Sequence, residues 1–315
     1  MKRAFIFPGQ GSQAVGMGKA LADAFPQARA IFDEVDEALS QKLSTIMWEG
    51  PAEELTLTAN TQPALMAVSL AAIRVLEAEA GLDLRKHAAF VAGHSLGEYS
   101  ALAAAGSLSI SDTARLLRIR GNAMQSAVPV GQGAMAALLG LEYEAALEVA
   151  REAAQGEVCD GANDNGGAQV VVSGHKSAVE RAVALAQTKG AKRAVMLAVS
   201  APFHCALMQP AADAMREALG NVTVNAPAVP VVANVEAAPI TDPVAIRDAL
   251  VRQVTGTVRW RESVAYMAAQ GVESFYEVGS GKVLTGLVKR IAAGASATAI
   301  GTPDDAAAFK ASLNG

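Results

Sequence analysis

Short apolar runs alternate along the chain with longer segments of helical periodicity. The runs Arg3–Phe7 and Ala88–Ala92 predict buried strands, whereas Thr61–Ala80 and Ser111–Gln125 have the composition and spacing of helices. The segment Ala28–Leu43 has the pattern of an amphipathic helix. Strands and helices that alternate in this way favour an α/β fold whose sheet is mostly parallel.

The pattern changes after Val128. From there it predicts strand, helix, strand, strand, helix and strand over Ala134–Leu139, Glu142–Ala154, Val158–Ala162, Gln169–Ser173, Ser177–Thr188 and Lys192–Val199. This order is that of a ferredoxin-like unit. We therefore expect a small ferredoxin-like subdomain over residues 128–198, inserted into a larger α/β subdomain made of residues 1–127 and 199–315.

The larger unit resumes after the insert. Its predicted elements are a helix, a strand, a helix, a strand and a helix over Ala206–Leu219, Val229–Ala233, Trp260–Ala269, Ser274–Val278 and Val283–Ala292. These elements continue the α/β alternation, so the large sheet is expected to draw strands from both ends of the chain.

A serine lies between two glycines in Gly93-His-Ser-Leu-Gly97, where the strand at 88–92 meets a predicted helix over Leu96–Ala105. This is the pattern of a nucleophile elbow, a strained strand-to-helix turn that leaves the serine hydroxyl exposed. The pattern alone has low specificity, because a turn of small residues with an idle serine would look the same. Ser95 is nevertheless the candidate nucleophile.

A serine needs a nearby base, which is usually histidine. His204 follows the predicted strand 192–199, at the carboxyl end where open α/β sheets place their sites. The other histidines are less suitable by position: His94 adjoins the serine, His87 precedes the strand, and His175 begins a helix of the insert. Since no acidic residue between Ser95 and His204 ends such a strand, we predict a Ser–His dyad whose ring is held by a carbonyl. The alternative is a structural histidine.

Two glycine-rich turns resemble nucleotide-binding loops. Gly9-Gln-Gly11 follows a strand, but the acidic residue of a dinucleotide site should end a second strand, and the segment 28–43 is predicted to be helical. In Gly279-Ser-Gly-Lys282 the residue after the lysine is Val283, where a phosphate loop has Ser or Thr. We instead expect the backbone N–H groups of Gln10 and Leu96 to form an oxyanion hole.

Arg120 is out of place on its predicted helix. On a helical wheel it lies near the middle of an apolar arc, and no carboxylate lies within one turn of it. A buried guanidinium needs an anionic partner or several acceptors. Either an internal ion pair or backbone carbonyls satisfy it, or it binds a carboxylate of the substrate as a bidentate clamp.

Composition narrows the class of protein. The chain has 315 residues, of which 51% are hydrophobic, enough for a sizeable core. A net charge of −5 argues against a nucleic-acid partner, and two cysteines provide neither a disulfide framework nor a metal cluster. No apolar run approaches the ~20 residues of a membrane helix, and no signal-peptide core is present. We expect a cytoplasmic protein without a membrane partner.

Several motifs in order resemble the malonyl-CoA:acyl carrier protein transacylases of bacterial type II fatty acid synthesis. They are FPGQGSQ, GHSLGEYSALAAAG, RGNAMQSAVP, ANDNGGAQVVVSG, SAPFH and EVGSGKVLTGLVKR, and together they cover nearly the whole chain. The resemblance implies a hydrolase-like large subdomain with a ferredoxin-like insert. It also implies ping-pong transfer from malonyl-CoA to holo acyl carrier protein, with neither a cofactor nor a metal.

The resemblance assigns a role to each candidate residue. It makes Ser95 the acylated nucleophile, His204 its base, the amides of Gln10 and Leu96 the oxyanion donors, Arg120 the ligand of the malonyl carboxylate, Gln253 the carbonyl that orients His204, and Phe203, with Leu96, the residues that narrow the acyl pocket. Around Gln253 the sequence reads Val-Thr-Gly-Thr-Val where the family commonly has an Asn-Pro turn, so the role of Gln253 is the least specific of these.

Other functions remain open from the sequence. A serine esterase or thioesterase would use the same serine and histidine, a docking subunit would need neither, and malonyl transferases of malonate decarboxylase or a polyketide pathway would share the chemistry. Because acyl carrier proteins are acidic, we expect their docking site to be a basic rim. The candidates are Lys189, Lys192 and Arg193 in one group, and Lys289 with Arg290 in another.

Overall fold

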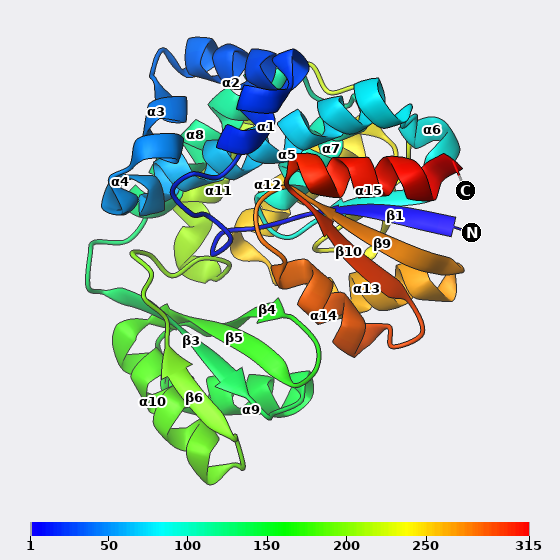
Figure 1. Cartoon of the computed structure of the whole chain (residues 1–315). Helices are drawn as coiled ribbons and strands as arrows, with labels where there is room; N and C mark the ends of the chain where they lie inside the picture. The colour runs from blue at the N-terminus through cyan, green and yellow to red at the C-terminus, as the bar shows by residue number, and fades with distance from the viewer. Residues whose placement is uncertain (1, 315) are drawn as a thin grey trace.

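The computed structural model describes residues 2–314 and contains two separate β-sheets (Figure 1). The larger, sheet A, has six strands in the order β10-β9-β1-β2-β7-β8. They are β1 (Lys2–Phe7), β2 (Phe90–Gly93), β7 (Val231–Ala233), β8 (Ala238–Ile240), β9 (Val272–Val278) and β10 (Ser296–Ile300). Every neighbouring pair is parallel except β7 and β8. The prediction of an α/β fold with a mostly parallel sheet is confirmed.

Helices cover both faces of sheet A. Phe5 and Phe7 belong to a core shared with helices on one face, whereas Ala4 and Ile6 pack on the other, as the two-residue period of a strand requires. In Figure 1 α5, α7 and α15 lie above the sheet, and α13 and α14 below it. The helices of this part are α1 (Lys19–Ala24), α2 (Pro26–Leu39), α3 (Leu43–Glu49), α4 (Ala52–Thr56), α5 (Thr58–Ala80), α6 (Leu84–His87), α7 (Gly97–Ala104), α8 (Ile110–Ser126), α11 (Gln209–Gly220), α12 (Pro243–Thr255), α13 (Trp260–Ala269), α14 (Val283–Ile291) and α15 (Pro303–Asn314).

Sheet B is antiparallel and has the order β4-β5-β3-β6. Its elements are β3 (Gly133–Leu139), α9 (Tyr143–Ala154), β4 (Cys159–Asp164), β5 (Gln169–His175), α10 (Lys176–Thr188) and β6 (Arg193–Met196), so the predicted order of strands and helices is present. Ala136 and Leu138 pack with α9 and α10 in a core of their own. Met135 and Ala137, which alternate with them on β3, face the larger unit.

The end of β4 joins sheet B to the larger unit. Asp164 N donates to Val258 O at 3.0 Å, and Val258 N donates to Ala162 O at 2.8 Å. Arg261 Nε lies 2.8 Å from Asp164 Oδ2 and adds an ion pair across the same junction. The two sheets are therefore fixed to each other beside the segment that follows α12.

Three predicted elements differ in the structure. The helix expected over 28–43 is divided, because Ser40 adopts a left-handed φ of 49° that ends α2. The strand expected over 192–199 ends at Met196, and residues 197–199 line a pocket. The helix expected over 206–219 begins as a 3₁₀ turn (Ala206–Met208) before α11.

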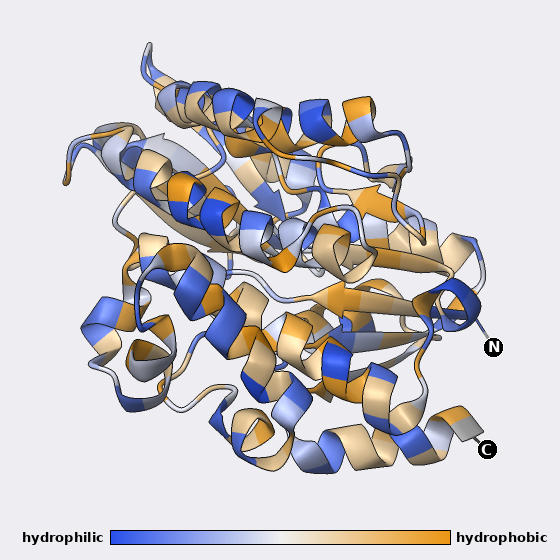
Figure 2. Cartoon of the chain, turned by 90° about the horizontal axis from the view of Figure 1, so that it is seen from above, coloured by the Kyte–Doolittle hydropathy of each residue, from blue (hydrophilic) through white to orange (hydrophobic). Residues whose placement is uncertain are grey.

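Hydropathy follows this architecture. In Figure 2 the outer faces of the surface helices carry hydrophilic residues, while the strands between them are largely apolar. Among the helices of residues 2–314, none combines the length and the apolar character needed to cross a bilayer.

Candidate active site

Ser95 occupies a sharp turn between β2 and α7. Its φ is 53°, in the left-handed region that a residue with a side chain rarely adopts. A Cβ on Gly93 would lie 1.9 Å from the carbonyl carbon of Gly97, and a Cβ on Gly97 would lie 2.3 Å from Phe7 O. Only glycines allow the strand, the turn and the helix to approach this closely, which is the backbone geometry of a nucleophile elbow.

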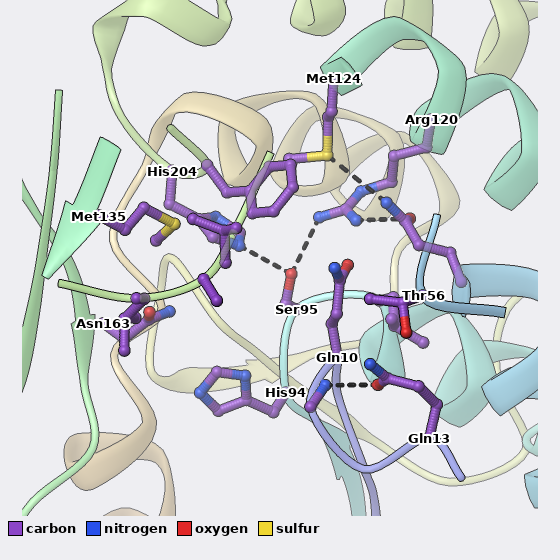
Figure 3. Close-up of a pocket in the computed structure, with 17 residues that line it drawn as sticks. Gln10, Gln13, Thr56, His94, Ser95, Arg120, Met124, Met135, Asn163 and His204 are labelled. Carbon is purple, nitrogen blue, oxygen red and sulfur yellow. Dashed lines mark hydrogen bonds between the residues drawn. The ribbon is translucent and has the colours of Figure 1, made fainter. Parts of the chain in front are cut away.

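His204 is held against the serine. Its Nε2 lies 2.7 Å from Ser95 Oγ (Figure 3). Its Nδ1 lies 2.9 Å from Gln253 O and 3.2 Å from Gly256 O. Because a carbonyl only accepts, Nδ1 carries the proton and Nε2 accepts from the serine hydroxyl. Within residues 2–314 no carboxylate contacts the ring.

The imidazole of His204 is neutral at physiological pH. Burial lowers its pKa to about 3, and the positive charge of Arg120 acts in the same direction. The side chain is 3% exposed. A neutral ring with a free Nε2 can take the serine proton, so the pair has the geometry and the protonation state of a nucleophile and its base.

Arg120 approaches the serine from α8 and is 1% exposed. Its Nη1 donates to Gln62 Oε1 at 2.7 Å, and its Nη2 donates to Gln253 Oε1 at 2.8 Å and to Ser95 Oγ at 3.1 Å. All three acceptors are neutral, and the part of the chain that the structure describes places no carboxylate in contact with the guanidinium. Burial lowers the pKa of Arg120. The site therefore holds a buried cation beside the nucleophile without a direct ion pair.

A pocket of about 320 Å³ opens over these groups. Gln10 lies beside Ser95 in Figure 3, and Leu96, Phe203 and Met124 also line the pocket. The lining is completed by Gly11, Gln13, Thr56, Gln62, His94, Arg120, Met135, Asn163, Leu197, Ala198, Val199 and His204. Its size and its mixture of polar and apolar lining residues are typical of a small-molecule site.

The loop that carries Gln10 packs directly on the elbow, since a Cβ on Gly9 would lie 2.7 Å from His94 O. Among residues 2–314, the backbone N–H groups of Gln10 and Leu96 find no protein acceptor. Two such amides beside a serine hydroxyl are available to an oxyanion.

The sequence did not predict three residues that contact Ser95, Arg120 or Gln253. Asn234 Oδ1 accepts from Ser95 N at 2.8 Å, and its Nδ2 donates to Gly93 O at 2.7 Å, so it fixes the elbow backbone. Asn234 directly follows β7, and its place at the carboxyl end of a strand could have identified it. Gln62 and Glu98 carry no comparable signal, because each lies on a helix among small and apolar residues.

The side chains of the remaining histidines bond to groups other than the Ser95 hydroxyl. His94 Nε2 lies 2.8 Å from Asn165 Oδ1, while the Nδ1 atoms of His87 and His175 accept from backbone amides. The two cysteines are buried thiols. Residues 2–314 contain no group of three or more His, Cys, Asp or Glu placed to hold a metal ion.

The turn at 279–282 does not offer a phosphate site. Glu277, which is fully buried, accepts from Leu284 N at 3.1 Å and from Thr285 N at 2.7 Å. These are the amides at the start of α14 that a phosphate would need. A protein carboxylate already occupies the position.

Comparisons with known proteins agree with this arrangement. The sequence matches the acyl transferase domain family over residues 4–312. It is 52% identical over 305 residues to the malonyl CoA-acyl carrier protein transacylase of Escherichia coli strain K12, covering 97% of each chain. The crystal structure of an acyl-carrier-protein S-malonyltransferase from Bartonella henselae has a TM-score of 0.98 at 58% identity, with 100% of both chains covered.

A further solved structure contains a carrier protein. It is described as a type II PKS acyl-carrier protein in complex with its malonyl-transacylase, and it has a TM-score of 0.95 at 44% identity, covering 99% of this chain and 100% of that one. The family match spans almost all of the chain, and the curated relative is aligned over nearly its whole length. The chain is therefore an acyltransferase and belongs to the malonyl-CoA:acyl carrier protein transacylases.

Proposed function

We propose that this enzyme transfers the malonyl group of malonyl-CoA to the phosphopantetheine thiol of holo acyl carrier protein, through a malonyl ester on Ser95. The observation that carries the proposal is the pairing of a strained serine and a neutral histidine with a buried, unpaired arginine. The first two residues suit acyl transfer in general, and the arginine suits an acyl group that bears a carboxylate.

The first half-reaction follows from these positions. His204 Nε2 takes the hydroxyl proton as Ser95 Oγ attacks the thioester carbonyl. The resulting oxyanion accepts hydrogen bonds from the amides of Gln10 and Leu96, and the Gln253 carbonyl stabilises the imidazolium through Nδ1–H. The C–S bond then breaks, and the coenzyme A thiolate leaves with the proton from His204.

The second half-reaction reverses these steps with another thiol. His204 accepts the proton of the phosphopantetheine thiol, and the thiolate attacks the malonyl ester. Collapse of the tetrahedral intermediate breaks the ester C–O bond and returns the proton to Ser95 Oγ. The result is a ping-pong transfer in which every proton passes through one imidazole.

Arg120 provides selectivity for the acyl group in this scheme. Its guanidinium lies 3.1 Å from Ser95 Oγ, close enough to reach a carboxylate one carbon beyond the ester carbonyl. Leu96 and Phe203 line the same pocket. In this scheme both residues narrow it beside the α-carbon of the acyl group. A branched acyl group such as methylmalonyl should therefore fit poorly.

We further propose that sheet A and its helices form a hydrolase-like subdomain of residues 1–127 and 199–315, and that residues 128–198 form a ferredoxin-like subdomain. The β-α-β-β-α-β order and the strand order β4-β5-β3-β6 support the second assignment. The carrier protein is that of fatty acid synthesis, with a polyketide carrier as the alternative that the related complex supports.

Intact-mass measurement tests the proposed function. The protein is mixed with malonyl-CoA and weighed, and holo carrier protein is then added. We expect a malonyl adduct that moves to the carrier, and no adduct on the Ser95→Ala variant, in which a small residue keeps the turn. Hydrolysis of the adduct without formation of malonyl carrier protein would identify a hydrolase. Malonylation of the Ser95→Ala variant would exclude Ser95 as the nucleophile.

A further inference from the structure

A carboxylate lies behind the serine turn, away from the pocket. Glu98, the second residue of α7, is fully buried. Its Oε2 accepts from Asn234 N at 3.1 Å and from Gln253 Nε2 at 2.8 Å. Its Oε1 is buried and has no hydrogen-bond partner among the described residues. The mechanism above makes no use of this group.

One side-chain amide connects Glu98 to Arg120. Gln253 Oε1 accepts from Arg120 Nη2 at 2.8 Å, while Gln253 Nε2 donates to Glu98 Oε2 at 2.8 Å. The amide thus lies with its oxygen toward the cation and its nitrogen toward the anion. Arg120 has no carboxylate in contact, so Glu98 balances its charge indirectly, through the side-chain amide of Gln253.

This arrangement changes when an anionic substrate binds. In the empty site one buried positive charge is balanced by one buried negative charge. A malonyl carboxylate at Arg120 adds a second negative charge beside the same cation, and two nearby carboxylates in a water-poor site resist being ionised together. Either one of the two carboxylates gains a proton, or the site binds the malonyl carboxylate less tightly.

Glu98 is the carboxyl group suited to gain the proton. Burial raises the pKa of Glu98 to about 7, although the hydrogen bonds from Asn234 and Gln253 and the charge of Arg120 oppose the rise. Protonation at the unpartnered Oε1 leaves both hydrogen bonds to Oε2 in place. The elbow and Gln253 can therefore keep their positions in either protonation state.

We propose that Glu98 takes up one proton from solvent when a malonyl carboxylate binds at Arg120, and releases it when the acyl group leaves. The inference rests on the carboxylate-binding role proposed for Arg120. Glu98 acts through Gln253 and does not touch the substrate, so it is a positioning residue that adjusts the charge of the site to its anionic ligand.

The other ionisable groups near Glu98 do not change their protonation state near neutral pH. His204, with a pKa of about 3, and His94, whose pKa burial lowers, stay neutral. Burial raises the pKa of Tyr99. The charge of Arg252 on α12 also acts on Glu98, and the bonds of Arg252 to Glu236 and Asp248 raise its pKa, so it stays charged. Proton uptake between about pH 6 and pH 8 is therefore assigned to Glu98.

Titration calorimetry of the Ser95→Ala protein tests the proposal, because this variant binds without being acylated. Malonyl-CoA is titrated at several pH values in two buffers of different ionisation enthalpy, which gives the number of protons taken up. Acetyl-CoA is the matched control, since it carries the same phosphates without the carboxylate. We expect malonyl-CoA binding to take up more protons than acetyl-CoA binding, by a difference that grows from about pH 6 to pH 8. Over the same range the ratio of malonyl-CoA affinity to acetyl-CoA affinity should fall by up to about tenfold per pH unit.

The Ser95→Ala, Glu98→Gln protein assigns the proton. Glutamine keeps the size of the side chain and cannot titrate, so the extra uptake should disappear while a thermal melt reports folding. Should this variant fail to fold, infrared difference spectra of Ser95→Ala decide, because malonyl-CoA should produce a carboxylic-acid C=O band that acetyl-CoA does not. Equal proton uptake for the two ligands, or uptake that persists in the glutamine variant, would overturn the inference.

A third variant separates this inference from the function on which it rests. If Arg120→Ala in the Ser95→Ala background leaves malonyl-CoA affinity unchanged, the carboxylate-binding role of Arg120 is wrong. If malonyl-CoA binding depends on Arg120 but takes up no extra proton, only the role of Glu98 is wrong.

Discussion

At the scale of single residues, the most informative side chain is Arg120, a buried cation with neutral acceptors only. In the proposed function Arg120 forms a buried charge pair with the malonyl carboxylate. Removing one partner of such a pair costs about 2–5 kcal/mol, or about 30- to 4,000-fold in transition-state binding. Arg120→Ala should lower kcat/KM for malonyl-CoA by that factor. Acetyl-CoA, which lacks the carboxylate, should react as well as before or better, because no desolvated cation then faces its methyl group.

Arg115 provides the control for this prediction. It lies on the same helix, has a solvent-exposed side chain and pairs with Asp112. Arg115→Ala should therefore leave kcat/KM unchanged for both malonyl-CoA and acetyl-CoA. The measurement is kcat/KM for malonyl-CoA and acetyl-CoA in the three proteins, with thermal melts to compare folding. Parallel losses for the two substrates in Arg120→Ala would mean that Arg120 supports the core and does not bind the carboxylate.

The sequence identified individual residues where chemistry and local pattern coincide. Ser95 and His204 follow predicted strands, and the helical wheel predicted that Arg120 lies on an apolar face, where the structure buries it. The acceptors of Arg120 could not be found in that way, because Gln62 and Gln253 are 58 and 133 positions away in sequence. Family resemblance, not periodicity, pointed to the Gln253 carbonyl, and the resemblance itself is confirmed by the relatives.

At the scale of secondary-structure elements, the glycines of the elbow determine how closely β2 and α7 approach. A Cβ on Gly97 would lie 2.3 Å from Phe7 O and 2.9 Å from Pro8 O, which are backbone atoms that cannot turn aside. Gly97→Ala should therefore displace α7, cost at least about 1–3 kcal/mol of stability and slow acylation of Ser95.

Gly286 on α14 is the matched control, because no heavy atom lies within 4 Å of the position that its Cβ would take. Gly286→Ala should be neutral or stabilising, since alanine loses less backbone entropy in a helix. Thermal melts and the rate of malonyl adduct formation compare the two variants. Wild-type stability in Gly97→Ala would show that the elbow tolerates a side chain at this position.

The elements themselves were predictable where their apolar pattern is strong. The helix expected over 61–80 is α5, and the strand expected over 3–7 is β1. The prediction lacked β10, an edge strand with the sequence Ser-Ala-Thr-Ala-Ile, because its small residues give a weak strand signal. It also lacked α12, the helix that carries Gln253, because the hydrophobic pattern around its Arg and Asp residues is weak.

At the scale of the whole molecule, the junction of the two sheets defines the approach to the serine. A second cavity of about 240 Å³ shares Gln10, His94, Asn163 and Leu197 with the pocket over Ser95. Its far wall includes Leu284 and Leu287 of α14 and Gln169 of β5. A carrier protein that brings a flexible thiol to Ser95 from the side of this second cavity would rest near the exposed end of α14.

The charges at this end distinguish the two basic groups expected from the sequence. Lys289 and Arg290 are exposed at the end of α14, and Arg290 Nη1 donates to Gln169 Oε1 at 3.1 Å, so this group flanks the second cavity. Lys189 instead pairs with Glu152 at 2.9 Å. We therefore expect the pair on α14 to provide the main attraction for an acidic carrier protein.

Charge reversal at both positions tests this assignment. Lys289→Glu with Arg290→Glu should raise KM for holo carrier protein, with the larger effect at low salt, and should leave KM for malonyl-CoA nearly unchanged, because the substituted residues lie outside the pocket around Ser95. The single reversals Lys289→Glu and Lys189→Glu form a matched pair, and Lys189→Glu should have the smaller effect on KM for carrier protein, since that lysine already has an acidic partner. The measurement is steady-state transfer at two ionic strengths. Equal increases in KM for carrier protein and malonyl-CoA would mean that α14 contacts coenzyme A. A larger effect from Lys189→Glu would instead place the docking site at the end of α10.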